Sequence, residues 1–291
     1  MTDRNRLRIL RVTLAHPHRY RWYRAATMGV TLAVLFAVPI AGLARFDVWG
    51  GGHLALGRPV DPARGLAAVL AAIAAFYVVT FLVNIPAGRL FCGFGCPVGQ
   101  LSRLADAIDA FPADAARRRR AWLALVGFAS ALALATLLWW VSPAVVVDGT
   151  SAARSAAFGI LLLVAGYAVL HGRRFRWGFC RKLCPIGLYY SAVQTPVVTR
   201  VDFDPHATCT GCDACAGICP AGLDPRRLDQ PVPSPGGLAF ADLPAAAHCL
   251  HCGACVEICE IMTRKHPGVP AMAFRRPTAA RDGDVARDAA A

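Results

Sequence analysis

The chain has 291 residues, of which 56% are hydrophobic and only 17% charged, and its formal net charge is +13. Soluble globular domains carry about 25% charged residues, so this composition argues against an ordinary soluble domain and favours a membrane protein. The positive charge does not indicate a nucleic-acid partner, because basic residues such as the arginine run at 117–120 stand at the ends of apolar stretches.

Four apolar stretches are long enough to cross the hydrocarbon core of a bilayer, which takes about 20 helical residues. They cover residues 25–44, 66–87, 121–141 and 155–170, and none contains Asp, Glu, Lys or Arg. We therefore predict an all-α membrane domain of four transmembrane helices at residues 25–200, preceded by a basic segment at 1–24.

The distribution of Arg and Lys predicts the orientation, because cytoplasmic loops are enriched in them. Seven arginines precede the first stretch, and five basic residues follow the fourth between 173 and 182. The second connection carries Arg89, Arg103 and the run at 117–120, whereas the first and third connections are poorer in basic residues. Both termini and every cysteine are therefore expected on the cytoplasmic side.

A repeated motif, Phe-Cys-x3-Cys-Pro-x-Gly, follows the second and fourth stretches. It contains Cys92 and Cys96 at its first occurrence and Cys180 and Cys184 at its second. The duplication predicts an internal hairpin repeat, with the two cysteine pairs side by side at one depth. A spacing of four would put both thiols of a pair on one helical face, with Pro97 in a first helical turn. These four cysteines are candidate redox thiols or ligands of a third metal site, and four structural thiols are the alternative.

Two runs with the spacing Cys-x2-Cys-x2-Cys-x3-Cys follow, which is the spacing that holds [4Fe–4S] clusters in bacterial ferredoxins. In two-cluster ferredoxins the fourth cysteine of each run ligates the other cluster, so the expected ligand sets cross between the runs. The first set is Cys209, Cys212, Cys215 and Cys259, and the second is Cys249, Cys252, Cys255 and Cys219. Zinc is the alternative, but zinc sites generally pair two short Cys-x2-Cys knuckles.

The complete runs predict two [4Fe–4S] clusters in a small cytoplasmic ferredoxin-like α+β domain at residues 201–270, followed by a disordered tail at 271–291. Glu260 stands where the second run would be expected to carry a proline. Other redox cofactors are not expected, because the chain has neither the Cys-x-x-Cys-His of an attached haem nor a Gly-x-Gly-x-x-Gly nucleotide fingerprint.

Together the four stretches, the paired motifs and the two runs resemble the membrane ferredoxin-type proteins of periplasmic nitrate reductase and methylamine-utilisation systems (the NapH and MauN family). The resemblance covers residues 19–270, and the paired motifs are its most specific part. It implies an electron-transfer protein of the bacterial inner membrane that is linked to the quinone pool. If it is an enzyme, it is a quinol dehydrogenase subunit that works in a complex with a periplasmic iron–sulfur protein or a cytochrome.

The same motifs also occur in regulators and in an assembly protein for a copper oxidase. The alternative function is therefore a maturation or regulatory iron–sulfur factor for another redox enzyme. The expected cofactors are two [4Fe–4S] clusters, and the residues leave a bound quinone and a third metal site open.

Overall fold

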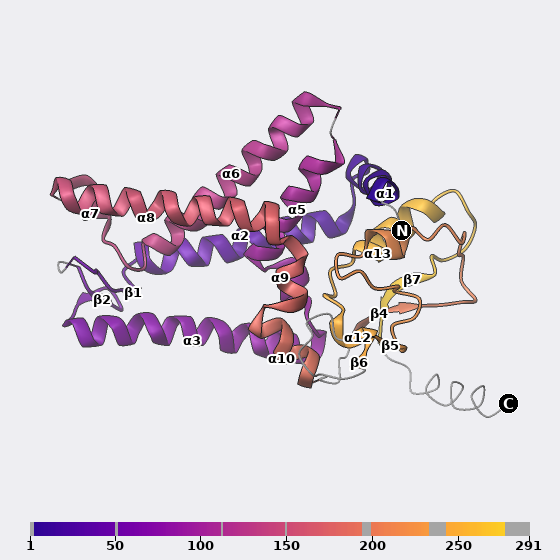
Figure 1. The fold of residues 1–291 in the computed structure, drawn as a ribbon. Helices are drawn as coiled ribbons and strands as arrows, with labels where there is room; N and C mark the ends of the chain where they lie inside the picture. Colours follow the sequence, from indigo (N-terminus) through magenta and orange to yellow (C-terminus); the bar gives the residue numbers. More distant parts are fainter. Residues whose placement is uncertain are drawn as a thin grey trace.

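The computed structural model describes residues 3–49, 52–111, 113–148, 150–193, 199–232 and 243–276. This part of the chain is mainly helical, with three small antiparallel sheets ordered β1-β2-β3, β4-β7 and β5-β6 (Figure 1). The helices are α1 (Asp3–Ala15), α2 (Arg19–Ile40), α3 (Pro62–Ala87), α4 (Leu90–Phe94), α5 (Pro97–Ala110), α6 (Ala115–Leu137), α7 (Pro143–Asp148), α8 (Ser151–Leu170), the π-helix η1 (His171–Phe175), α9 (Arg176–Lys182), α10 (Pro185–Val193), α11 (Ala214–Ile218), α12 (Ala245–His248) and α13 (Ala254–Thr263). The strands are β1 (Ala44–Arg45), β2 (Leu54–Ala55), β3 (Arg58–Pro59), β4 (Arg200–Phe203), β5 (Pro231–Val232), β6 (Leu243–Pro244) and β7 (Met272–Arg275).

Four helical stretches are long and apolar enough to cross a membrane. They are α2, α3, α6 and the stretch Ala152–Ser191, which runs from α8 through η1 and α9 into α10. Each overlaps one of the four apolar stretches found in the sequence, so the prediction of a multi-pass helical membrane protein is confirmed. Polar caps start two of these helices: Asp61 accepts a hydrogen bond from the Arg64 amide at 3.1 Å, and Asp114 accepts one from the Arg117 amide at 2.9 Å.

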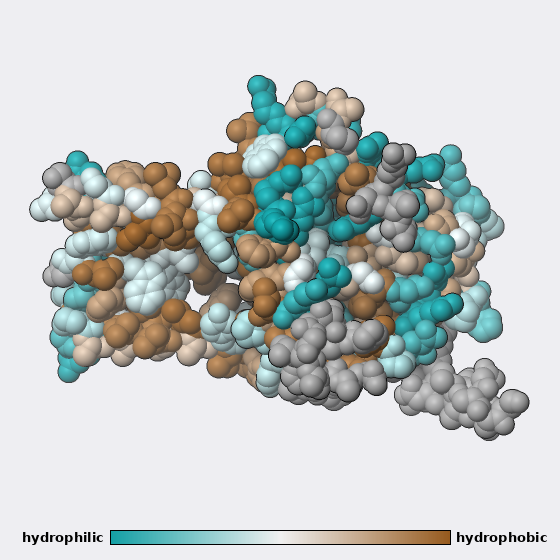
Figure 2. Space-filling model, in the orientation of Figure 1, coloured by the Kyte–Doolittle hydropathy of each residue, from teal (hydrophilic) through white to brown (hydrophobic). Residues whose placement is uncertain are grey.

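The cysteines gather at one end of the long helices. The helices α4, α5, α9 and α10, which carry the two Phe-Cys-x3-Cys-Pro motifs, stand where the long helices meet the C-terminal part of the chain (Figure 1). The β1–β3 sheet lies at the opposite end. Apolar side chains gather over the long helices, and hydrophilic ones over the cysteine-rich end (Figure 2). The molecule is thus polarised along its long helices.

The C-terminal part is joined to the membrane helices by one continuous hydrophobic core. Val201, Ile218, Val256 and Met272 are buried in it, and so is Trp177 of α9. Cys92 and Cys180 of the membrane motifs pack against the same core. The cysteine-rich part is therefore seated directly on the ends of the long helices.

A buried ion pair fixes this seat. Arg24 of α2 donates to Glu257 of α13, and these residues are only 7% and 1% exposed. Arg24 also donates to the backbone oxygen of Cys252 at 2.9 Å. A second, more exposed contact lies nearby, where Glu260 accepts from His18 at 2.9 Å and from Arg19 at 2.6 Å. Glu260, the departure from the expected proline, therefore ties the second run to the start of α2.

The C-terminal boundary differs from the prediction. Strand β7 lies inside the segment that was expected to be disordered from residue 271, because it pairs with β4 and Met272 is buried beneath it. The rest of the predicted tail, from residue 277 on, lies outside the described residues.

We expect Glu257→Gln to destabilise the seat strongly, because it leaves the Arg24 guanidinium buried without a counter-charge. Breaking a buried ion pair costs about 3–5 kcal/mol. The matched change Glu260→Gln should cost about 0–1 kcal/mol, because its partner Arg19 is largely exposed. The thermal unfolding midpoints of the two purified proteins in detergent measure the difference, and equal midpoints would show that the Arg24–Glu257 pair does not hold the seat.

Candidate metal centres

Two hollows in the cysteine-rich part are each lined by four cysteines. Hollow 1 is lined by Cys209, Cys212, Cys215 and Cys259, and hollow 2 by Cys249, Cys252, Cys255 and Cys219. The structure thus brings each of the two crossed sets expected from the sequence together around one hollow. The hollows enclose similar space, about 360 and 340 Å³ including the part open to solvent. Similar volumes and equal numbers of cysteines are expected if the two hollows are two copies of one kind of site.

The loops around the two hollows share an unusual backbone conformation. The third residues of the two runs, Gly211 and His251, have φ values of +65° and +46°. The fifth residues, Asp213 and Gly253, have φ values of +53° and +69°. Left-handed residues other than glycine are uncommon and persist where the surroundings hold them, often at functional sites. Turns of this kind aim backbone amides into a concavity that binds anions, as in many iron–sulfur sites.

The donor chemistry of both hollows fits a [4Fe–4S] cluster. Thiolates are the ligands of iron–sulfur clusters and of other soft metal centres. Burial raises the pKa of Cys219 to about 11 and that of Cys249 to about 12, so these thiols would be protonated at neutral pH unless a metal displaced the proton. Within the described residues, no three His, Cys, Asp or Glu side chains lie close enough together to hold a single metal ion. A cubane cluster poses a different requirement, because each of its four thiolates binds a separate iron.

The membrane motifs have the same local structure as each other. The Cys96 amide donates to the Phe91 carbonyl, and the Cys184 amide donates to the Phe179 carbonyl, both at 2.9 Å. Cys96 has extended backbone and caps α5, whereas Cys92 lies inside α4. The expectation that both thiols of a pair lie on one helical face is therefore wrong, because the chain turns at Gly95 between them.

Prolines begin the helices that follow the two cysteine pairs. Pro97 is in the first turn of α5, as expected, and α10 begins at Pro185. A proline fits this position because the first amides of a helix have no intrahelical partner. Each motif therefore ends one short helix and starts the next at its second cysteine.

The two motifs pack against each other reciprocally. A Cβ atom added at Gly187 would lie 2.7 Å from Nη2 of Arg89, and one added at Gly99 would lie 3.8 Å from the Trp177 ring. Arg89 and Trp177 each stand three residues before the first cysteine of their own motif, and the two glycines each stand seven residues after it. This packing and the contact of Arg89 with the Cys180 backbone bring Cys92 and Cys96 of the first motif next to Cys180 and Cys184 of the second. We call these four side chains the thiol quartet.

The thiol quartet and hollow 2 lie back to back. A Cβ atom added at Gly93, next to Cys92, would lie 2.6 Å from Cα of Cys252 and 2.6 Å from the Leu250 carbonyl oxygen. The Arg89 amide donates to Nδ1 of His251 at 2.9 Å, which fixes that left-handed residue in the hollow 2 loop. Only a residue without a side chain allows the first motif to approach the loop so closely.

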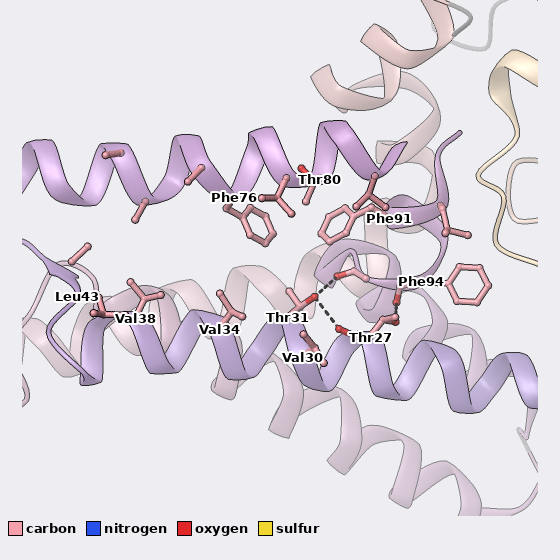
Figure 3. A pocket seen from close by; sticks show the side chains of 18 of the residues that line it. Thr27, Val30, Thr31, Val34, Val38, Leu43, Phe76, Thr80, Phe91 and Phe94 are labelled. Atoms are coloured by element: carbon pink, nitrogen blue, oxygen red, sulfur yellow. Dashed lines mark hydrogen bonds between the residues drawn. The ribbon is translucent and has the colours of Figure 1, made fainter. Parts of the chain in front are cut away.

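A large apolar groove runs between α2 and α3 and ends at α4. Its volume is about 1490 Å³. Val30, Val34 and Val38 point into it from α2, and Phe76 faces Phe91 at its inner end, with ring centroids 5.7 Å apart (Figure 3). The inner end is formed by residues of the first motif, Leu90, Phe91, Phe94 and Gly95. Helix α4 therefore separates the groove from the thiol quartet.

Glu257 and the groove were not predicted from the sequence, and Arg24 and Arg89 served there only as evidence for orientation. Two of these carried a signal: Glu257 is an acid inside a cysteine run, and Arg89 stands just before a motif at the end of an apolar stretch. The groove has no local signal, since its walls are α2 and α3, which look in sequence like ordinary apolar spans.

The chain is similar to ferredoxin-type proteins. It is 28% identical over 196 residues to the ferredoxin-type protein NapH of Escherichia coli, a match that covers 62% of this chain and 63% of that relative. It is 27% identical over 203 residues to NapH of Haemophilus influenzae, covering 68% of each chain. It is also 30% identical over 140 residues to the methylamine utilization ferredoxin-type protein MauN of Paracoccus denitrificans, covering 46% of this chain and 48% of that relative.

These matches confirm the resemblance to NapH and MauN ferredoxin-type proteins that the paired motifs and the cysteine runs predict. The chain spans a little under two thirds of the length of the Escherichia coli relative. No family model and no solved structure matches the chain.

We expect Gly93→Ala to disturb the contact between α4 and the hollow 2 loop, because the new methyl group would meet backbone atoms that cannot move independently. Overpacking of this kind costs about 1–3 kcal/mol. The control Gly127→Ala on α6 has nothing within 4 Å of the added Cβ atom and should be neutral or slightly stabilising. Thermal unfolding of both variants in detergent tests this, and an unchanged midpoint for Gly93→Ala would mean that the approach is looser than described.

Proposed function

We propose that this NapH- and MauN-like chain is a membrane electron-transfer protein that binds two [4Fe–4S] clusters and exchanges electrons with a quinone. The observation that carries the proposal is the crossed lining of the two hollows, each with three cysteines from one run and the fourth from the other. Two-cluster ferredoxins use this same crossing. The names of the relatives, ferredoxin-type proteins, agree with it.

The residues of the two hollows would hold the two clusters close enough together for electron transfer between them. When bound, the clusters supply one-electron transfer, at potentials tuned by hydrogen bonds and burial. Cys255 of hollow 2 and Cys215 of hollow 1 pack in the same hydrophobic core, so the two hollows are neighbours. Arg226 lines hollow 1, where its ion pairs with Asp213 and Asp224 fix the guanidinium beside the cysteines.

The groove between α2 and α3 supports a quinone as the electron donor or acceptor. Its walls are almost entirely apolar, and its volume exceeds the roughly 300–1,000 Å³ of common small-ligand pockets, so it suits a long lipid-soluble molecule. Its inner end is built from the first motif, between Phe76 and Gly95, so a ring bound there would contact α4, the short helix that contains Cys92 and precedes Cys96.

We further propose that the cysteine-rich end faces the cytoplasm of a bacterial inner membrane, because basic residues are concentrated in the segments that meet there. All the cysteines lie at that end of the long helices. Electrons for a periplasmic partner would therefore cross the membrane on a mobile quinone or through a second subunit. This geometry favours work in a complex with a partner redox protein.

The crossed assignment makes a specific prediction about paired variants. Cys219→Ser should alter the EPR signal of the same cluster as Cys249→Ser, although residue 219 belongs to the first run. Cys259→Ser should likewise alter the same cluster as Cys209→Ser. EPR spectra of the four dithionite-reduced variants, purified without oxygen, distinguish the pairs. If Cys219→Ser affected the same cluster as Cys209→Ser, each run would hold its own cluster and the crossing would be refuted.

The groove predicts that Ala75→Trp blocks quinol access without affecting the clusters, because the new indole would fill the groove beside Phe76. The quinol concentration for half-maximal cluster reduction, or the matching quinone concentration for oxidation, should rise at least about tenfold, equivalent to roughly 1.4 kcal/mol of lost binding free energy. Leu162→Trp on α8, whose side chain is 72% exposed and does not line the groove, is the matched control. Identical half-maximal concentrations in the two variants would exclude this groove.

A further inference from the structure

Arg89 is a buried cation whose acceptors among the described residues are all uncharged oxygen or sulfur groups at long range. It is only 5% exposed, and its Nε atom has no hydrogen-bond partner. Its Nη1 atom lies 3.4 Å from Oγ of Ser191, and its Nη2 atom lies 3.5 Å from the carbonyl oxygen of Cys180. Both distances exceed the usual N–H···O range of about 2.7–3.2 Å.

The other buried arginine of this region is paired differently. Arg24 meets the carboxylate of Glu257, whereas no carboxylate in the described part of the chain forms an ion pair with Arg89. An arginine stays protonated in proteins, so Arg89 cannot remove its charge by losing a proton. Charged side chains are almost never buried unless they are paired. The surroundings of Arg89 therefore require an anion.

The groups that face Arg89 are sulfur atoms and imidazoles. Its Nη2 atom reaches the Cys180 backbone of the second motif and lies beside Gly187, whose added Cβ atom would also lie 3.5 Å from Cβ of Cys184, and Cys92 follows Arg89 by three residues. The buried rings of His248 and His251 also lie near Arg89: the Arg89 amide donates to His251, and Ser191 lies between the Arg89 guanidinium and His248. The missing anion must therefore form at the sulfur atoms.

We propose that Cys92, Cys96, Cys180 and Cys184 ligate a third [4Fe–4S] cluster, and that Arg89 compensates its negative charge. Two neutral thiol pairs would leave the guanidinium buried and unpaired, whereas a cluster held by four thiolates is a net anion. The reciprocal packing of Arg89 on Gly187 and of Trp177 on Gly99 brings the two cysteine pairs together from separate hairpins. The quartet has the all-cysteine ligand set that such a cluster takes.

The position of the quartet explains why a redox-active group is needed there. Helix α4 presents Phe91 and Phe94 to the groove, while Gly93 on the same helix meets the hollow 2 loop. A cluster in the quartet would lie between the quinone groove and the cluster of hollow 2. A single zinc ion fits less well, because no three His, Cys, Asp or Glu side chains of the described residues lie close enough together to hold one ion, and zinc is redox-inactive and would interrupt this order.

Iron analysis tests the proposal directly. The chain purified without oxygen should contain about twelve irons and as many labile sulfides, four for each of three clusters. Cys96→Ser and, separately, Cys184→Ser should lower this to about eight while the EPR signals of the two ferredoxin-type clusters persist. About eight irons in the unaltered protein, or zinc with eight irons, would overturn the third cluster and leave the proposed function of the two hollows standing.

Arg89 variants test the electrostatic part, and they apply even if the cysteine variants fail to fold. Arg89→Met should lose the third cluster or shift its reduction potential downward, because removing a nearby positive charge disfavours the reduced cluster. Arg89→Lys should retain the third cluster, with a smaller downward shift of its reduction potential. Arg118→Met on α6 is the control, since that side chain is exposed and its loss removes the same charge away from the quartet. Equal iron content and potentials in Arg89→Met and Arg118→Met would refute the role of Arg89.

Discussion

The close seating of the second cysteine run on the first membrane motif is the contact on which the other features depend. Gly93 allows the backbone of α4 to approach Cys252, and the Arg24–Glu257 pair holds α13 against α2. The same contact brings hollow 2 to the thiol quartet and, through α4, to the groove. A looser contact would move hollows 1 and 2 away from the groove between α2 and α3. Electron transfer between a quinone in the groove and the hollows would then slow, because its rate falls with distance.

The sequence was sufficient for the parts of the molecule that are encoded locally. Apolar length predicts the four long helices. The crossed cysteine sets were expected from the rule for two-cluster ferredoxins, which adds a long-range contact to the local spacing. In the structure, Cys219 lines hollow 2 and Cys259 lines hollow 1.

The features that the sequence did not predict depend on contacts between distant segments. Arg24 and Glu257 are 233 positions apart, and nothing in the local sequence of either indicates the other as its partner. The thiol pairs were expected on single helical faces from their spacing of four, but the turn at Gly95 separates Cys92 from Cys96. Strand β7 was expected to be disordered because the chain turns rich in Ala, Arg and Asp just after it, whereas pairing with β4 orders it.

Electron exchange between quinone and the cysteine sites can be measured by equilibrating the protein without oxygen, in lipid nanodiscs, with quinone and quinol mixed at a series of ratios. EPR would then record the reduced clusters at each ratio. We expect the cluster signals to rise and fall with the quinol fraction, and this response to weaken in Ala75→Trp. Clusters that are present but remain silent at every ratio would rule out a quinone-linked relay, and would favour a maturation or regulatory factor instead.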